Sequence, residues 1–279
     1  MTPRHFIAGL CVALVPAVGH ADESLDLDRG SEVVENPAGL ARAANAGGDH
    51  GFLTTHAETL PEGAMGLNIY EFIFYGFSAG VTDRLELSLT LTPPVATPPE
   101  WVALQARYVV HRSERTVVAV RLTNLDLSSW GDYGYQGGFY TLGPGVAVDR
   151  FVGDEGRVSL HAGLSVHAGP IVGESATVED AADEPSSPTW AGLLWLEVGV
   201  TFRGTDWLDL MLEGIAAAAM TEDIGFRLAP YGLVNYGVRF FNAFAAADVA
   251  LARPVGDLGD ADLGWLVMGI PYLGLSVRF

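Results

Sequence analysis

Apolar and polar residues alternate along most of this chain from residue 51 onward. Val158, Leu160 and Leu164, for example, alternate with Ser159 and His161, which is the two-residue period of a β-strand with one apolar face. Turn-forming residues separate the alternating segments, each of which is about 10–15 residues long. The pattern predicts strands within residues 102–110, 118–123, 140–149, 158–167, 190–202, 208–213, 228–240 and 263–279.

The connections between these segments differ in length in a regular way. Longer connections are expected at residues 93–100, 128–138, 173–188, 221–226 and 256–262, and shorter ones at 82–84, 111–114, 153–156, 204–206 and 242–243. Short turns at one end and long loops at the other are typical of transmembrane barrels. The pattern therefore predicts an all-β fold: a single antiparallel transmembrane β-barrel of about twelve strands, with short periplasmic turns and longer extracellular loops.

Two parts of the chain allow more than one interpretation. Residues 64–82 form either two short strands that fold back near Glu71 or one long strand that pairs with residues 52–58, and both choices give an even strand count. The Ala-rich stretches 215–220 and 243–252 have good helix propensity. We expect strands there as well, because the alternation of the preceding strand continues into the first of these stretches.

Aromatic residues gather at both ends of the expected strands. Those beside the short turns are Phe151, Phe202, Trp207, Phe241, Phe244 and Phe279, and those near the long loops are Trp101, Trp130, Tyr140, Trp190 and Trp265. Aromatic side chains concentrate at the two membrane–water interfaces of transmembrane proteins. The two groups therefore predict two interfacial girdles.

The chain ends on an aromatic residue that follows an alternating apolar row. Within residues 263–279, the last residues that share one face are Leu273, Leu275, Val277 and Phe279. This segment resembles the C-terminal strand of bacterial outer-membrane β-barrel proteins, which the barrel-assembly machinery recognises. The resemblance implies a location in the outer membrane of a Gram-negative envelope, with outer-membrane lipid and the assembly machinery as partners. It also implies that these residues act as the assembly signal.

The amino-terminal residues predict export. Residues 1–21 contain Arg4 and His5, then an apolar run, then a small-residue cleavage motif that ends at Ala21. This is the pattern of a secretory signal peptide, and we expect cleavage after Ala21. The single cysteine, Cys11, lies within the expected signal peptide, so the mature chain forms no disulfide.

Charge and hydropathy restrict what the mature chain can be. After the signal peptide, no run of about 20 uncharged apolar residues occurs, so no transmembrane helix is expected. The chain carries 34 Asp and Glu against 15 Lys and Arg, and this negative balance disfavours nucleic acid as a partner. Residues 22–50 are acidic and lack a helical or strand period, which predicts a mobile periplasmic lead before the transmembrane β-barrel of residues 51–279.

The alternation places one set of polar and charged side chains on the inner face of the barrel. A charge that faces hydrocarbon near the bilayer midplane would cost a few kcal/mol, so these side chains are expected to point inward. The candidate lumen-lining residues are Glu86, Arg107, Arg121, Asp149, His161, His167, Glu197, Asp209, Glu213 and Arg239. Their charges either pair across the lumen and keep the interior polar, or line a conduit and set its selectivity. For a conduit, we expect Glu197, Asp209 and Glu213 to form a negative patch that faces arginines elsewhere on the wall.

No catalytic, cofactor-binding or metal-binding residue is predicted. The chain lacks a Gly-x-Ser-x-Gly elbow, a His-Glu-x-x-His helix and a phosphate-binding loop. His161 and His167 share a strand face with Ser165, but the two histidines are separated by about 20 Å along a strand. That distance is too long for one metal or one Ser–His contact without help from neighbouring strands, so polar lining of the lumen is favoured.

A barrel of twelve strands has an interior between the filled one of eight strands and the open channel of sixteen. A narrow open pore and an occluded one are both compatible with that width. The sequence therefore predicts a narrow porin-like channel or small-solute transporter that is not an enzyme, with small solutes as further partners. Two alternatives stay open: a structural or adhesion barrel of the envelope without a pore, and a barrel-embedded hydrolase.

Overall fold

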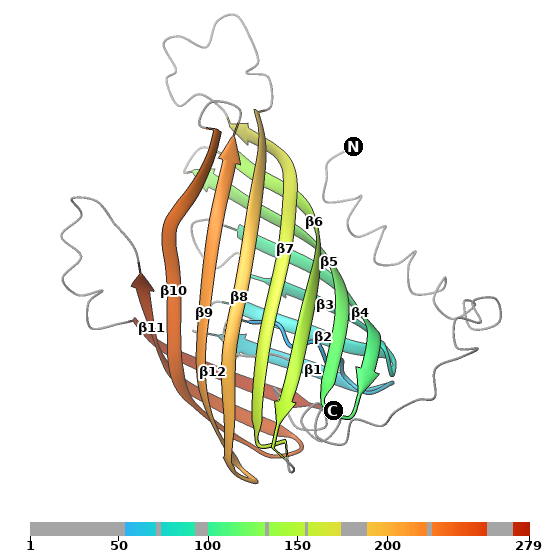
Figure 1. Cartoon of the computed structure of the whole chain (residues 1–279). Coiled ribbons are helices and arrows are strands. Elements are labelled where there is room, and N and C mark those ends of the chain that lie inside the picture. Colours follow the sequence, from blue (N-terminus) through green and yellow to red (C-terminus); the bar gives the residue numbers. More distant parts are fainter. Residues whose placement is uncertain are drawn as a thin grey trace, which may run out of the picture. The chain divides into compact units, whose positions relative to one another are not determined.

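The structure of the protein, a computed structural model, is a closed antiparallel β-barrel (Figure 1). It describes residues 54–70, 74–92, 100–131, 134–153, 156–173, 189–221, 225–255 and 270–279. The expected signal peptide and the acidic lead, residues 1–50, lie outside the described residues, so both stay predictions. No helix in the described ranges is long and apolar enough to cross a membrane.

Twelve strands form the wall of the barrel. They are β1 (Met65–Tyr70), β2 (Phe74–Thr82), β3 (Leu85–Leu91), β4 (Glu100–Ser113), β5 (Thr116–Gly131), β6 (Gly134–Val152), β7 (Val158–Gly173), β8 (Thr189–Thr205), β9 (Leu208–Thr221), β10 (Gly225–Phe241), β11 (Ala245–Val255) and β12 (Ile270–Arg278). Each strand pairs with the next, and β1 pairs with β12 to close the ring. Backbone bonds of 2.9 and 3.1 Å between Met65 and Phe279 seal that junction. The expected antiparallel barrel of about twelve strands is confirmed.

The beginning of the barrel follows one of the two interpretations of the sequence. β1 and β2 pair as a hairpin, with Tyr70 opposite Phe74, so residues 64–82 hold two short strands. The alternative pairing with residues 52–58 is wrong, because β2 and β12 occupy both edges of β1. Residues 54–60 lie inside the barrel instead, as described below.

The two Ala-rich stretches lie in β9 and β11, so their assignment to strands is confirmed. Ala has good helix propensity, but propensity is a weak preference that tertiary contacts override. In this barrel each of these strands has a paired neighbour on both sides, which satisfies its backbone N–H and C=O groups.

Three of the five longer connections that the alternation predicted are long in the structure. Long connections join β3 to β4, β7 to β8 and β11 to β12, whereas β1–β2, β5–β6 and β9–β10 are joined by short ones. The long loop expected at residues 128–138 is wrong, because β5 and β6 stay paired as far as Gly131 and Gly134. The polar, Gly-rich residues there suggested a loop, but strand formation depends on pairing with neighbours more than on intrinsic preference.

The two faces of the wall differ in polarity. On β7, Leu160 and Leu164 are 43% and 41% exposed on the outside, whereas Ser159 and Ser165 are buried inside. This distribution is the reverse of that in a water-soluble protein, whose apolar residues are mostly inside. An exposed apolar exterior with a polar interior is typical of a barrel that faces lipid.

The aromatic residues at the short turns divide between the two faces. Phe202, Trp207, Phe244 and Phe279 lie on the outside and are strongly exposed. The expectation that Phe151 and Phe241 belong to the same girdle is wrong, because both are buried inside the barrel. The guanidinium carbon of Arg203 lies 4.6 Å from the ring centroid of Phe241, a cation–π contact. Alternation along the strand therefore sets the face of an aromatic residue, and its distance from the turn does not.

Candidate functional site

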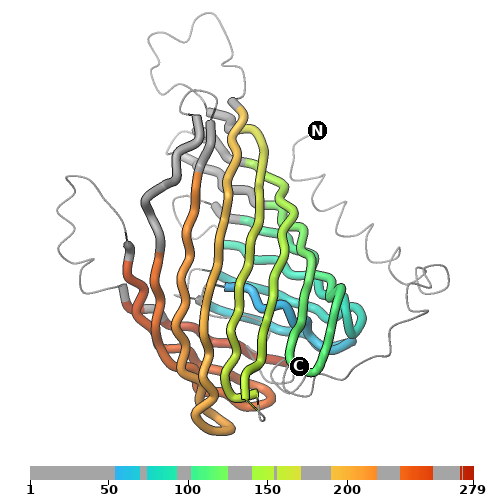
Figure 2. Tube along the Cα trace, viewed as in Figure 1, coloured from blue at the N-terminus to red at the C-terminus, as the bar shows by residue number. Residues whose placement is uncertain are grey.

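The first described residues of the chain lie within the ring of strands. Residues 54–60, here called the inner segment, precede β1 (Figure 2, blue end of the trace). All of their side chains except that of Thr55 are buried. The inner segment is not part of any strand of the wall. Its backbone polar groups therefore need partners other than a sheet ladder.

Carboxylates of the wall accept hydrogen bonds from the backbone of the inner segment. The N–H donors and carboxylate acceptors, with their N···O distances, are Thr55 and Glu197 (3.0 Å), Ala57 and Asp149 (2.8 Å), and Leu60 and Glu86 (2.8 Å). Hydrogen bonds to an ionised acceptor are stronger than those between neutral groups. The acceptors lie on β8, β6 and β3, so three separate parts of the wall fix the path of the inner segment.

The first residue of the inner segment reaches a histidine and a glutamate on the wall. Thr54 Oγ1 donates to Glu213 Oε1 at 2.9 Å and lies 2.9 Å from His161 Nε2. His161 Nε2 is 3.7 Å from the Glu213 carboxylate, and its ring centroid is 4.7 Å from that of His56. Thr54 thereby connects β7 to β9 through a polar network.

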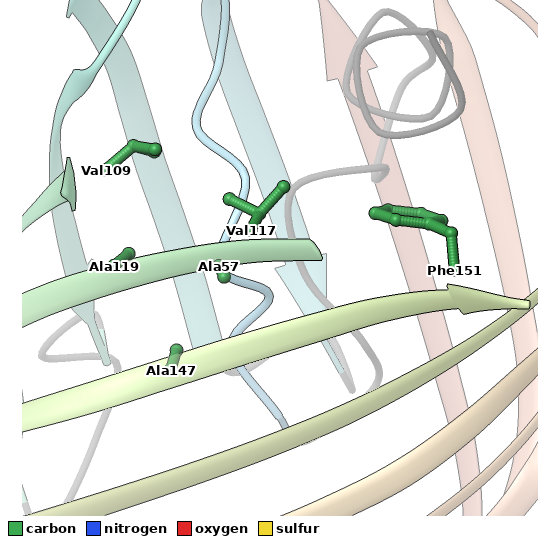
Figure 3. Packing of buried hydrophobic residues seen from close by; sticks show 6 residues of the cluster. All are labelled: Ala57, Val109, Val117, Ala119, Ala147 and Phe151. Carbon is green, nitrogen blue, oxygen red and sulfur yellow. The ribbon is translucent and has the colours of Figure 1, made fainter. Parts of the chain in front are cut away.

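Arginines and apolar contacts hold the remainder of the inner segment. Glu58 forms an ion pair with Arg112 of β4, and Arg107 Nη1 donates to the carbonyl of His56 at 2.7 Å. Ala57 belongs to a buried apolar cluster whose other members come from the wall (Figure 3). Those members are Val109, Val117, Ala119, Ala147 and Phe151. The inner segment thus fills interior space that the wall side chains leave at this level.

The charges on the inner face of the wall form ion pairs. The pairs, with their N···O distances, are Arg107–Glu86 (2.7 Å), Arg121–Glu197 (2.8 Å), Arg239–Asp248 (2.6 Å) and Arg203–Asp209 (3.2 Å). Arg121 of β5 reaches Glu197 of β8 across the interior, and the other pairs join neighbouring strands. Glu197 meets Arg121, one of the arginines expected to face it, whereas Asp209 binds Arg203 of the neighbouring strand. The negative patch as a whole stays a prediction. Each of these pairs neutralises its own charges and keeps the interior polar.

The candidate lumen residues are all buried, with 1–6% of their surface exposed. They lie on β3 (Glu86), β4 (Arg107), β5 (Arg121), β6 (Asp149), β7 (His161 and His167), β8 (Glu197), β9 (Asp209 and Glu213) and β10 (Arg239). The inner segment brings six of them together, namely Glu86, Arg107, Asp149, His161, Glu197 and Glu213. Asp209 and Arg239 take part in separate pairs. Their role as the lining of a solute path stays a prediction.

A serine and a histidine on β7 are in contact. His167 Nε2 lies 3.0 Å from Ser165 Oγ, and Arg121 Nη2 lies 3.4 Å from the same oxygen. The expectation that favoured no Ser–His contact is wrong, because it considered the distance between the two histidines and not residues two apart on one face. The contact has the geometry of a nucleophile and its base. His167 Nδ1, which would bind an orienting group, has no hydrogen-bond partner within the described residues.

A cavity of about 160 Å³ lies beside the inner segment, against β1 to β5. Thr55 and the Glu86–Arg107 pair border it. Its other polar lining residues carry uncharged hydroxyl or amide groups: Asn68, Ser78, Ser88, Thr90, Gln105 and Thr123. The described parts of the chain contain no group of three or more His, Cys, Asp or Glu residues placed to hold a metal ion.

Sequence reasoning missed the inner segment and its contacts with Arg112 and the wall carboxylates. Residues 52–58 were considered only as a strand of the wall. A signal was present, since the inner segment includes the run Thr-Thr-His-Ala-Glu-Thr. Polar side chains occur there at both odd and even positions, so the run has no apolar face for lipid.

No protein-family model matches the chain, and no curated protein matches its sequence. Solved structures with a similar fold include the NanC porin, at 7% identity and a TM-score of 0.43 over 77% of this chain and 97% of that chain. LpxR from Salmonella typhimurium has 8% identity and a TM-score of 0.38 over 77% of this chain and 99% of that chain. The CymD monoaromatic hydrocarbon channel has 9% identity and a TM-score of 0.36 over 78% of this chain and 87% of that chain. These values are too low to assign a function, so the functional conclusion rests on the residues of this chain.

Proposed function

We propose that this chain is an outer-membrane β-barrel that acts as a narrow channel for small solutes, and that the inner segment closes the channel at rest. The observation that carries the proposal is the set of N–H bonds from the inner segment to Glu86, Asp149 and Glu197. Water can replace such separate polar contacts, so the segment can leave the lumen. A strand of the wall cannot leave without exposing unpaired backbone groups to lipid.

The outer surface supports a location in a membrane. Exposed large apolar residues occur on every strand from β4 to β12, and extensive apolar surfaces of this kind mark contact with lipid or with other proteins. A closed barrel also satisfies its backbone hydrogen bonds without water. On this proposal, the barrel-assembly machinery recognises the outward-facing residues Leu273, Leu275, Val277 and Phe279, which are 42–68% exposed.

The interior supports a role in solute passage more than a purely structural one. Burial of an ion pair is often less stabilising than apolar packing of similar volume. A barrel with only a structural role could therefore be filled with apolar side chains. Within the described residues, the interior instead holds the four ion pairs of the wall, the Glu58–Arg112 pair and a polar cavity.

Planar-bilayer recordings of the full chain test whether the inner segment closes the channel. The donor and the acceptor of one hydrogen bond between the segment and the wall are changed separately. Asp149→Asn weakens the acceptor for Ala57 N, and Ala57→Pro removes the donor without changing the wall. A hydrogen bond to a charged group contributes about 1.5–3 kcal/mol. Each variant should therefore raise the ratio of open to closed time roughly 10- to 150-fold.

Asp248→Asn is the matched control for the loss of charge. It removes the same charge from the inner face of β11, where the carboxylate binds Arg239 and not the inner segment. The open-to-closed ratio should not change in this variant. If Asp149→Asn and Asp248→Asn changed the open-to-closed ratio equally, the loss of charge in the lumen would explain the opening, and closure by the inner segment would be refuted. Absence of current in all of these proteins would favour the structural or adhesion barrel.

A hydrolase is a second candidate, and the contact between Ser165 and His167 is the observation that favours it. Catalysis by this pair would require a group that orients His167 through Nδ1 and space for a substrate beside Ser165. The cavity described above is not bordered by either residue. The channel is the better supported function, because it accounts for both the cavity and the inner segment.

A further inference from the structure

The cavity beside the inner segment is of a size that suits one small molecule. Its volume is about 160 Å³, and β1 to β5 supply its wall. In another protein, an engineered cavity of about 150 Å³ accommodates benzene. The present cavity therefore has room for a single small ring or a short open chain.

The charged groups at the border of the cavity are already bound to partners. Arg107 donates to Glu86 and to the His56 carbonyl, both at 2.7 Å. Glu86 also accepts the hydrogen bond from Leu60 N at 2.8 Å. A charged solute would have to disrupt these contacts or remain without a counter-charge. Both outcomes are unfavourable, so the cavity favours uncharged solutes over anions and cations.

The remaining polar lining suits a solute that carries several hydroxyl groups. Ser78 of β2 lies opposite Ser88 of β3, and Thr90 of β3 lies opposite Ala103 of β4. Hydroxyl groups both donate and accept hydrogen bonds, as do the amides of Asn68 and Gln105. Among the described residues, none of those that line the cavity is aromatic. Gln105 Nε2 already donates to Thr123 Oγ1 at 3.0 Å. The other hydroxyl groups and the Asn68 amide can form hydrogen bonds with a polyol, which a hydrocarbon ring cannot do.

The geometry points to a binding site in this cavity for a small uncharged polyol of about the size of one sugar ring. The inference rests on the proposed function in one respect, since such a solute would be one that the channel carries. Binding can nevertheless be measured without any passage through the barrel. The two proposals can therefore fail separately.

Saturation-transfer NMR on the full chain in lipid nanodiscs tests the site. Xylose and glucose serve as uncharged probes, and glucosamine and glucuronate serve as ring-matched cationic and anionic probes. We expect the sugars to bind, and each charged probe to bind at least about tenfold more weakly than glucose. Equal or tighter binding of a charged probe would overturn the assignment of the ligand class.

Two substitutions on one strand locate the site. Ala103 lines the cavity, so Ala103→Phe should fill it and abolish sugar binding. Ala106 lies opposite Leu122, which is exposed on the outer face, so Ala106→Phe adds the same ring outside the barrel. Sugar binding should be unchanged in the second variant. Binding that persists in folded Ala103→Phe would overturn the site.

Thr90→Val keeps the side-chain volume and removes one hydroxyl group from the cavity. It should weaken sugar binding several-fold and provides a second measurement if Ala103→Phe does not fold, which heat-modifiable migration in gels would report. No binding of either sugar to the wild-type protein would overturn the inference. Ion conductance without sugar binding would refute only the polyol site, and sugar binding without conductance would refute only the channel.

Discussion

The ion pair between Arg121 and Glu197 can distinguish a sealed interior from a water-filled one. Both Nη atoms of Arg121 donate to Glu197, at 3.1 and 2.8 Å, and the two side chains are only 3% and 6% exposed. If the inner segment closes the lumen at this level, removal of one partner leaves the other charge buried without compensation. If the lumen is filled with water, the solvent replaces the lost partner.

The sealed and the water-filled interior differ in how much stability is lost when one partner of the ion pair is removed. Breaking a buried ion pair by removal of one partner costs about 3–5 kcal/mol, so Arg121→Met and Glu197→Leu should each lower the free energy of unfolding by that amount. The double variant removes both charges and should be destabilised by much less than the sum, which gives a coupling energy of about 3 kcal/mol. Glu197 also accepts Thr55 N, but that loss occurs in both variants that lack Glu197 and cancels in the cycle.

Urea-induced unfolding in lipid vesicles, followed by tryptophan fluorescence, measures these free energies. The pair Arg203–Asp209 provides a control, because Arg203 is 20% exposed. Because this pair is more exposed than Arg121–Glu197, its coupling energy should be the smaller of the two. A similarly small coupling energy for Arg121 and Glu197 would show that water reaches their pair, and closure of the lumen at rest would then be wrong.

Two further predictions concern the wall, and the same unfolding measurement tests both. Leu122→Arg should lower the free energy of unfolding by about 2–4 kcal/mol, because Leu122 faces outward near the middle of β5, whereas Thr123→Arg projects into the polar cavity and should cost much less. Equal costs would refute the assignment of the two faces. Gly199→Ala should cost about 1–3 kcal/mol, because its added Cβ would overlap the ring of His161. Gly214→Ala should have little effect, since the nearest atom to its Cβ would be 3.5 Å away, and a larger loss there than at Gly199 would contradict this packing.

The strands of the wall could be predicted from the sequence because lipid imposes a rule on every second residue. Leu164 must face outward and Ser165 inward, whatever their neighbours are. The end of a strand is less constrained, since beyond the apolar part only backbone pairing decides where it stops. For that reason β5 and β6 extend to Gly131 and Gly134, through residues that the sequence placed in a loop.

The interior could be predicted only as a set of inward-facing residues. Alternation places Arg121 and Glu197 inside, but it does not reveal that they meet across the interior from β5 and β8. The inner segment was harder to predict, because no rule of polarity applies to a segment that contacts neither lipid nor bulk water. Its Ala57 is fully buried and its neighbours His56 and Glu58 are buried polar residues.

The charge of the interior explains how a segment without a periodic pattern can be held in one place. Among the described residues of the wall, buried carboxylates outnumber buried arginines. The acids are Glu86, Asp149, Glu197, Asp209, Glu213 and Asp248, and the arginines are Arg107, Arg121 and Arg239. Any chain segment other than proline supplies N–H donors, so a backbone that enters the lumen can satisfy the additional carboxylates.

These contacts depend on the path of the main chain more than on its side chains. Ala57 donates to Asp149 through its backbone nitrogen, and a different small residue at this position would keep the donor. Proline would remove it, because its nitrogen carries no hydrogen. On the proposed function, opening requires a change only in the backbone path of the inner segment, and the pairing of the twelve wall strands need not change.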